Sequence, residues 1–239
     1  MIEAGLECAE TIDSALAAVE KAGVKLQIGF NRRFDANFAR VRAAIDSGEI
    51  GRPALLHIIS RDPGPPPIEY VKGSGGMFLD MTIHDFDMAR FLLGDEVTEL
   101  YAAAGVLVDP AIGAQGDVDT ALVTLKFAGG ALGVIDNSRR AVYGYDQRID
   151  LLGSAGGIRT ENLHANTATV STRDAVRRDL PLNFFMERYT ESYVVEMQAF
   201  VDAVRNDTPV PATGEDARAA TALALAARQS YTENRVIAL

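Results

Sequence analysis

Apolar residues recur every three to four positions near both ends of the chain, and this spacing predicts amphipathic helices there. The predicted helices cover Thr11–Gly23, the segment of Phe34, Phe38, Val41 and Ile45, the segment from Met186 to Val204, and Glu215 to about Asn234. Gly23 and Gly48 stand where two of these helices are expected to end, because glycine closes a helix at little cost.

Alternation of apolar and polar residues predicts a strand at Val24–Phe30, and strand-favouring residues bounded by turn signals predict further strands through the middle of the chain. The predicted strands are Val24–Phe30, Ala54–Ser60, Val97–Val108, Thr120–Phe127, Ala131–Ser138, Gln147–Leu152 and Gly157–Asn162, with Thr167–Thr172 as an extension of the same sheet. Short glycine-containing turns at Ala128–Gly130 and Gly153–Gly156 predict two hairpins. Hairpins pair their strands antiparallel.

These elements predict an α+β fold in which a large, mostly antiparallel or mixed sheet carries helices on one face. The other face must also be covered, because the residues expected there include apolar side chains. Candidates for that open face are Leu122, Leu132, Val134 and Ile149 or their neighbours. We therefore expect a homodimer or homotetramer that assembles through the open sheet face.

Composition and charge narrow the class of protein. The chain has 239 residues, 48% hydrophobic and 23% charged, as globular domains do. Its net charge of −10 argues against a nucleic-acid partner, and no apolar run reaches the ~18 residues of a membrane span. Cys8 is the one cysteine, so no internal disulfide can form and a cytoplasmic location is expected.

The segment GGMFLDMTIHDFDMARFLLG, Gly75–Gly94, carries the candidate chemistry. In a helix, Asp80 and His84 would lie about 40° apart and one turn from each other, so both can point at one spot. A carboxylate there can raise the pKa of the imidazole and orient it as a general base. The alternative is a surface ion pair. His57 and His164 make no ligand-like pair with His84, so no metal site is predicted.

Four stretches together resemble the C-terminal part of one enzyme family. They are VKLQIGFNRRFD (Val24–Asp35), SRDPGPPPIEYVKGSGGMFLDMTIHDFDMARFLLG (Ser60–Gly94), FFMERYTESYVVEMQAFVDAV (Phe184–Val204) and TPVPATGEDARAATALALAA (Thr208–Ala227). The chain resembles the glucose-fructose oxidoreductase, inositol dehydrogenase and rhizopine-catabolism family, abbreviated Gfo/Idh/MocA, and within it the inositol 2-dehydrogenases.

The resemblance implies specific roles for several residues. His84 would take the proton of a substrate hydroxyl while hydride leaves for NAD or NADP, and Asp80 would bind a hydroxyl or orient His84. Further contacts to a small polyol or sugar are implied for Arg32, Arg61, Asp62 and Tyr189. Plain salt bridges remain the alternative for the two arginines, and core packing for Tyr189.

The family's cofactor domain has no counterpart in the sequence pattern. A Rossmann fingerprint needs a strand, a glycine turn and a helix, and neither Gly73–Gly76 nor Gly153–Gly157 has that context. We therefore expect no complete Rossmann domain and no cofactor-binding residue. Residues 1–23 are interpreted as a helical remnant of the domain junction, and residues 24–239 as the substrate-binding and oligomerisation domain.

Members of the resembled family carry a Glu-Lys-Pro element whose lysine completes a Lys–Asp–His set. The corresponding stretch here is Glu7–Asp13, and a register held by Cys8 and Ile12 puts Glu10 at the lysine position. A carboxylate cannot supply that ammonium. The sequence thus predicts the substrate domain of an NAD(P)-dependent oxidoreductase acting on the CH–OH group of a cyclic polyol or sugar, inactive as an isolated chain. The alternatives are a non-catalytic polyol-binding or oligomerisation module, and a lyase or isomerase that uses Asp80 and His84 alone.

Overall fold

A large sheet dominates the structure. The computed structural model describes the backbone of residues 2–239 and the side chains of residues 11–239. In this part of the chain a seven-stranded sheet has the order β6-β5-β1-β4-β3-β2-β9. Its strands are β1 (Pro53–Arg61), β2 (Val97–Gly105), β3 (Thr120–Phe127), β4 (Leu132–Ser138), β5 (Asp146–Gly153), β6 (Gly157–Arg159) and β9 (Ile237–Ala238). Among the described pairs, β1 and β4 run parallel and the others antiparallel.

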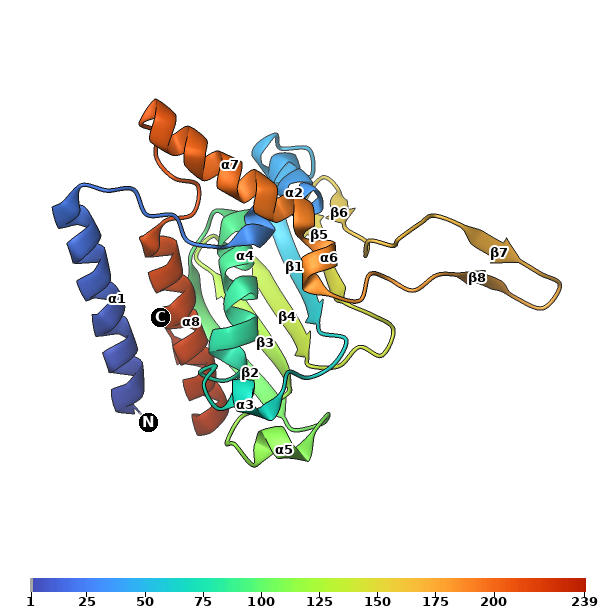
Figure 1. Cartoon of the computed structure of the whole chain (residues 1–239), viewed down its shortest axis with the longest axis horizontal. Helices are drawn as coiled ribbons and strands as arrows, with labels where there is room; N and C mark the ends of the chain where they lie inside the picture. The colour runs from blue at the N-terminus through green and yellow to red at the C-terminus, as the bar shows by residue number, and fades with distance from the viewer. Residues whose placement is uncertain (1) are drawn as a thin grey trace.

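Helices α4 and α8 lie against one face of this sheet, and α1 lies beside α8 rather than on the sheet (Figure 1). The helical elements are α1 (Ile2–Ala22), a 3₁₀ turn (Asn31–Phe34), α2 (Ala36–Asp46), α3 (Ile68–Val71), a π-helical turn (Phe78–Thr82), α4 (Ile83–Leu93), α5 (Pro110–Gly113), α6 (Phe185–Arg188), α7 (Thr190–Asn206) and α8 (Gly214–Glu233). No helix in the described part is long and apolar enough to cross a membrane.

Local sequence explains where the main helices begin and end. The Asp35 carboxylate accepts from Asn37 N and Phe38 N at the start of α2, as an N-cap residue does. At α8, Thr213 and Asp216 form a reciprocal capping box. α4 ends at Gly94 in the left-handed conformation, with φ of 59°.

The core lies between the sheet and its helices. Alternate residues of the central strands, such as Leu56 and Ile58 on β1 and Val123 on β3, are buried against this layer. Phe86 and Leu92 of α4 face them and are fully buried. The α+β architecture predicted from sequence is therefore confirmed, with both predicted hairpins, β3–β4 and β5–β6, in place.

Two predicted sheet strands were wrong. Val24–Phe30 is extended but joins no ladder; Ile28 N donates to Ala212 O, so the segment binds a loop instead. The predicted extension at Thr167–Thr172 contains β7 (Thr169–Ser171), which pairs with β8 (Val176–Arg178) in a separate two-stranded sheet. That hairpin projects from the body as an arm (Figure 1).

Three smaller predictions also need correction. The first helix extends back to Ile2 rather than starting at Thr11. The predicted helix from Met186 to Val204 is interrupted at Tyr189, a buried residue that separates α6 from α7 in the chain. Ile149 does not face outward; it is 1% exposed on the helix side, and Leu152 on the same strand faces out instead.

The open face of the sheet carries both apolar and charged side chains. Leu122 and Leu132 are 50% and 52% exposed there, as predicted, and Leu55 beside Leu132 is 49% exposed. Leu152 pairs with Leu55, so three leucines of adjacent strands form a continuous apolar row across β5, β1 and β4.

Candidate active site

The carboxyl ends of the parallel strands β1 and β4 hold the first two groups of the candidate site. Asp62 directly follows β1, and Arg139 directly follows β4. Asp62 N donates to Ser138 O at 2.9 Å, which keeps the two strand ends together. Arg139 N donates to Asp119 O at 2.8 Å. Parallel strands end at the same edge of the sheet, so the two side chains meet there.

The Gly75–Gly76 pair brings the next segment close to this edge. Their φ angles are 83° and 87°, in the region that favours glycine. The Asp117 carboxylate accepts from Met77 N at 3.0 Å, and a Cβ on Gly76 would lie 2.9 Å from Asp117 Oδ1. The chain then enters the π-helical turn that carries Asp80. Such turns occur often at functional sites.

Asp80 is tied to the rest of the site through both carboxylate oxygens. Tyr70 of α3 donates its hydroxyl to Oδ1 at 2.6 Å. Nη2 of Arg139 lies 2.8 Å from Oδ2. The Asp80 side chain is 14% exposed, so this carboxylate remains reachable from solvent.

His84 lies deeper, at the start of α4. Within the described structure its Nδ1 is buried without a hydrogen-bond partner, and its ring packs edge-on against Phe30 with centroids 6.1 Å apart. Burial lowers the pKa of His84 to about 3; the charge of Arg32 acts in the same direction and that of Asp80 opposes it. The imidazole is therefore neutral at neutral pH and has a lone pair available for a proton.

Arg32 belongs to a buried ion pair beside His84. Its Nη1 donates to Asp85 Oδ1, and its Nη2 donates to Ser60 at 3.3 Å. Asn137 Nδ2 donates to the other Asp85 oxygen at 2.9 Å. Burial acts to lower the pKa of Arg32, but the charge and hydrogen bond of Asp85, together with the nearby Tyr189 and Tyr145, outweigh it and the pKa is raised. Arg32 is thus a fixed cation beside the histidine.

Asp62 and Tyr189 complete the group that the sequence singled out. Burial raises the pKa of Asp62 to about 6, against the opposing charges of Arg139 and Arg32. Tyr189 is 2% exposed, and its hydroxyl has no partner among the described residues. Its ring meets Tyr145 edge-on with centroids 6.0 Å apart, and burial raises the pKa of Tyr189 to about 12.

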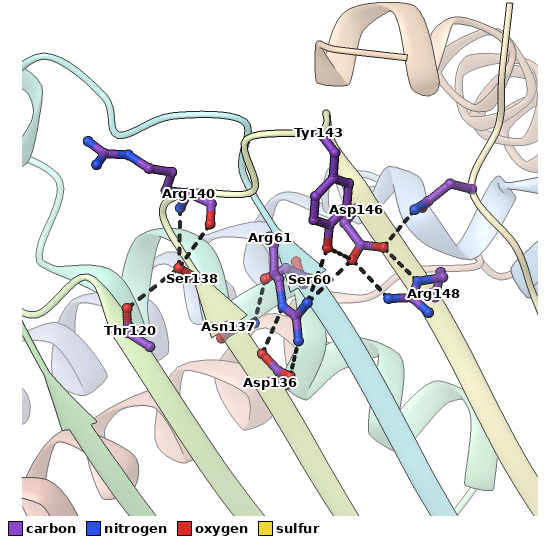
Figure 2. A network of polar contacts seen from close by, with 11 residues as sticks. Ser60, Arg61, Thr120, Asp136, Asn137, Ser138, Arg140, Tyr143, Asp146 and Arg148 are labelled. Carbon is purple, nitrogen blue, oxygen red and sulfur yellow. Dashed lines mark hydrogen bonds and ion pairs between the residues drawn. The ribbon is translucent and has the colours of Figure 1, made fainter. Parts of the chain in front are cut away.

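The structure places Arg61 apart from this group. Figure 2 shows Arg61 on the open sheet face, where it forms a two-point ion pair with Asp136 of β4. Arg61 also donates to the Tyr143 hydroxyl at 3.2 Å, and that hydroxyl donates to Asp146 at 2.5 Å (Figure 2). Successive strand residues point to opposite faces, which separates Arg61 from Ser60.

Sequence reasoning missed Arg139 and Tyr70, which hold Asp80. A signal for Arg139 was present, since it immediately follows the predicted strand Ala131–Ser138, and Asp62 stands two positions after the predicted strand Ala54–Ser60. The pairing of Arg32 with Asp85 was also missed. The predicted lysine replacement, Glu10, lies among the residues whose side chains the structure does not describe.

The glycine-rich stretches of the described part do not form a dinucleotide site. Gly153 and Gly156 lie in the β5–β6 hairpin, where a Cβ on Gly153 would lie 2.2 Å from Ile50 O. Gly75 and Gly76 follow the short helix α3, not a strand. Neither stretch has the strand, turn and helix of a pyrophosphate site. No group of three metal-binding side chains occurs in the described part.

Comparison with known proteins decides the family. The model of the GFO/IDH/MocA C-terminal domain matches residues 38–159. The chain belongs to the GFO/IDH/MocA family. The resemblance predicted from the sequence motifs is thereby confirmed.

Relatives and one solved structure show how far the similarity extends. The uncharacterised oxidoreductase YrbE of Bacillus subtilis is 53% identical over 90% of this chain and 63% of its own length. Myo-inositol 2-dehydrogenase of Thermotoga maritima is 50% identical over 95% of this chain and 68% of its own length. This family member thus spans about two thirds of these two relatives.

A solved structure of scyllo-inositol dehydrogenase from Lactobacillus casei with bound cofactor NAD(H) and scyllo-inositol superimposes with a TM-score of 0.88. It is 29% identical, and the match covers 96% of this chain and 69% of that one. The fold is therefore shared with a dehydrogenase that was solved with both a polyol and a nicotinamide cofactor.

Proposed function

We propose that this chain is the substrate-binding and catalytic domain of an NAD-dependent oxidoreductase that oxidises a ring CH–OH group of an inositol-like polyol. The observation that carries the proposal is the buried Nδ1 of His84, which lacks a partner and lies near the charges of Asp80 and Arg32. A buried polar atom without a partner costs free energy unless a ligand or water satisfies it. The names of the inositol dehydrogenase relatives support the choice of substrate.

The reaction would proceed by proton and hydride transfer from one carbon–oxygen unit. His84 would take the hydroxyl proton, and the electron pair of the O–H bond would form the second carbon–oxygen bond of the ketone. The hydrogen of the C–H bond would leave with its own electron pair as hydride, for which bound NAD would be the acceptor. NAD supplies the two-electron acceptor when bound. The negative charge of Asp80 stabilises the imidazolium that forms, because a nearby opposite charge favours the protonated histidine.

The residues around this pair would bind the ring. Asp62 and Asp80 can accept hydrogen bonds from hydroxyls, and the buried Tyr189 hydroxyl can donate or accept one. Arg32, held by Asp85, keeps a positive charge beside His84, which disfavours early protonation of the base. Arg61 does not take part in substrate binding, because its hydrogen-bond partners Asp136 and Tyr143 lie on the open face.

We assign residues 24–239 to the substrate and oligomerisation domain and residues 1–23 to the junction with a cofactor domain. Neither glycine stretch in the described part fits a dinucleotide. We therefore expect the isolated chain to bind a polyol without oxidising it. Titration calorimetry with myo-inositol and, separately, with NAD⁺ tests this expectation. We expect a heat of binding with myo-inositol and none with NAD⁺. No heat of binding with myo-inositol, or tight binding of NAD⁺, would contradict the proposal.

A non-catalytic polyol-binding or assembly module is the second candidate, favoured by the open sheet face. The leucine row of Leu152, Leu55 and Leu132 leaves apolar area uncovered in a single chain. We propose a homodimer or homotetramer that buries this row. A test of the two candidate functions replaces the histidine that matches His84 with glutamine in a full-length relative. Loss of turnover with retained polyol binding supports catalysis by this domain.

A further inference from the structure

Two carboxylates and one guanidinium from three separate elements meet at the edge of the candidate site. Arg139, after β4, lies with Nη2 2.8 Å from Asp80 Oδ2 and with Nη1 3.8 Å from Asp62 Oδ2. The Arg139 side chain is 3% exposed, against 14% for Asp80 and 25% for Asp62. The arginine is therefore the buried member, and the two carboxylates are the reachable ones.

Arg139 is held in place from its backbone, and its guanidinium is incompletely hydrogen-bonded. Its N–H donates to Asp119 O, and the Asp119 carboxylate in turn accepts from three consecutive N–H groups, Leu107 to Asp109. Within the described residues Nε and Nη2 of Arg139 make no well-aligned hydrogen bond, although Nη2 is ion-paired. A rigid, buried cation with spare donors suits a site that receives further acceptors with its ligand.

The charges of this cluster indicate what kind of ligand it accepts. Among the described residues, Asp62 and Asp80 are both ion-paired with Arg139, while Arg32 is ion-paired with Asp85. An excess of negative charge remains at the reachable surface. Ionised carboxylates accept hydrogen bonds and donate none, so they favour hydroxyl donors and repel acidic sugars.

We propose that Arg139 is a positioning residue that keeps the Asp62 and Asp80 carboxylates side by side beside His84, so that they bind two adjacent hydroxyls of one uncharged ring. The inference rests on the proposed function and adds Arg139 and the two-hydroxyl contact to it. Arg139 itself touches the carboxylates and acts on the substrate through them.

The ligand-free test follows the carboxyl carbons of aspartates by NMR during a pH titration of the whole chain. The charged groups that face Asp62 are Arg139, Arg32, Asp80 and Asp85. In Arg139→Gln the Asp62 midpoint should move up by about one pH unit or more, because an opposite charge is lost. Arg139→Lys keeps the charge and should stay near the wild-type midpoint. An unchanged Asp62 midpoint in Arg139→Gln would overturn the positioning role.

The ligand-bound test measures myo-inositol affinity by calorimetry. Arg139→Gln and Asp62→Asn should each weaken binding at least about tenfold, as expected for a lost charge-assisted hydrogen bond. The matched control is Arg140→Gln, because Arg140 is the exposed neighbour on the same loop and should bind like wild type. Equal affinity in wild type and in a folded Asp62→Asn variant would overturn the two-hydroxyl contact.

Analogues that lack a single hydroxyl complete the test. Wild type should bind one deoxy-inositol more weakly than myo-inositol, by the same factor by which Asp62→Asn weakens the binding of myo-inositol. The Asp62→Asn variant should bind that deoxy-inositol and myo-inositol with equal affinity. If wild type binds no inositol at all, the proposed function fails, and the two-hydroxyl contact fails with it. The NMR titration then still decides whether Arg139 holds the carboxylates.

Discussion

Arg33 and Asp87 form a two-point ion pair in the interior of the protein. Arg33 Nε donates to Asp87 Oδ2 at 2.9 Å, and Nη2 donates to Oδ1 at 2.5 Å. The side chains are 7% and 1% exposed. Arg33 Nη1 also donates to Pro211 O at 2.8 Å, so this pair joins three distant parts of the chain.

Removing one partner of this pair should destabilise the fold strongly. Asp87→Asn leaves the buried Arg33 charge less compensated, and such losses cost about 3–5 kcal/mol. Lys126→Gln, which breaks the exposed pair with Glu99, should cost about 1 kcal/mol or less. Urea unfolding of the two variants measures the difference. Equal losses would show that the buried pair is not a main support of this region.

His84 should make stability depend on pH. Its pKa is about 3 in the folded chain and 6.5 ordinarily, so below pH 6.5 the unfolded chain binds one more proton. The contribution of neutral His84 to the free energy of unfolding is fully present above pH 6.5 and is lost as the pH falls toward 3. The slope for one group is about 1.4 kcal/mol per pH unit. From pH 6.5 to 5, wild type should therefore lose about 2 kcal/mol more than His84→Gln.

Asp62 should act in the opposite direction. Its folded pKa of about 6 exceeds the ordinary 3.8, so between these values the folded chain binds the extra proton. Its contribution is present below pH 3.8 and is lost as the pH rises through 6. Asp62→Asn should therefore make the acid loss of stability steeper than in wild type between pH 6 and 4. Urea unfolding at pH 4.5 and 6.5 measures this. An equal change in unfolding free energy between the two pH values in wild type and in Asp62→Asn would contradict the assignment.

The open sheet face should determine the size of the particle in solution. Leu55→Glu with Leu132→Glu places two charges in the leucine row and should convert an oligomer into a monomer of 25.6 kDa. Leu107→Glu is the control, because Leu107 is 78% exposed and lies after β2, outside the sheet. Light scattering coupled to size exclusion measures the mass. A wild-type monomer would refute assembly through this face.

Gly76 should be needed for the entry into the π-helical turn. A Cβ there would lie 2.9 Å from Asp117 Oδ1, in addition to the strain of φ at 87°. Gly116→Ala is the matched control, because its φ is 77° and nothing lies within 4 Å of the added atom. Gly76→Ala should be less stable than this control by about 1 kcal/mol or more in urea unfolding. It should also weaken myo-inositol binding, because Asp80 follows in the same turn.

Local chemistry along the chain was enough to predict much of the fold. Strand-favouring residues on both sides of glycine turns placed the β3–β4 and β5–β6 hairpins, because hairpin pairing is decided by neighbours in sequence. Helical spacing placed α8, whose cap residues lie beside it in the chain. The motifs around Asp80 and His84 identified the family, which the domain match then confirmed.

Contacts between distant residues decided the rest. Val24–Phe30 alternates as a strand does, but an extended segment becomes a strand only where a partner ladder is available. The parallel pairing of β1 with β4 brings Asp62 close to Arg139, which lies 77 residues further along the chain. Ion pairing depends on distances in space, so the sequence by itself determined which charged groups exist, and the tertiary structure alone decided which of them share a site.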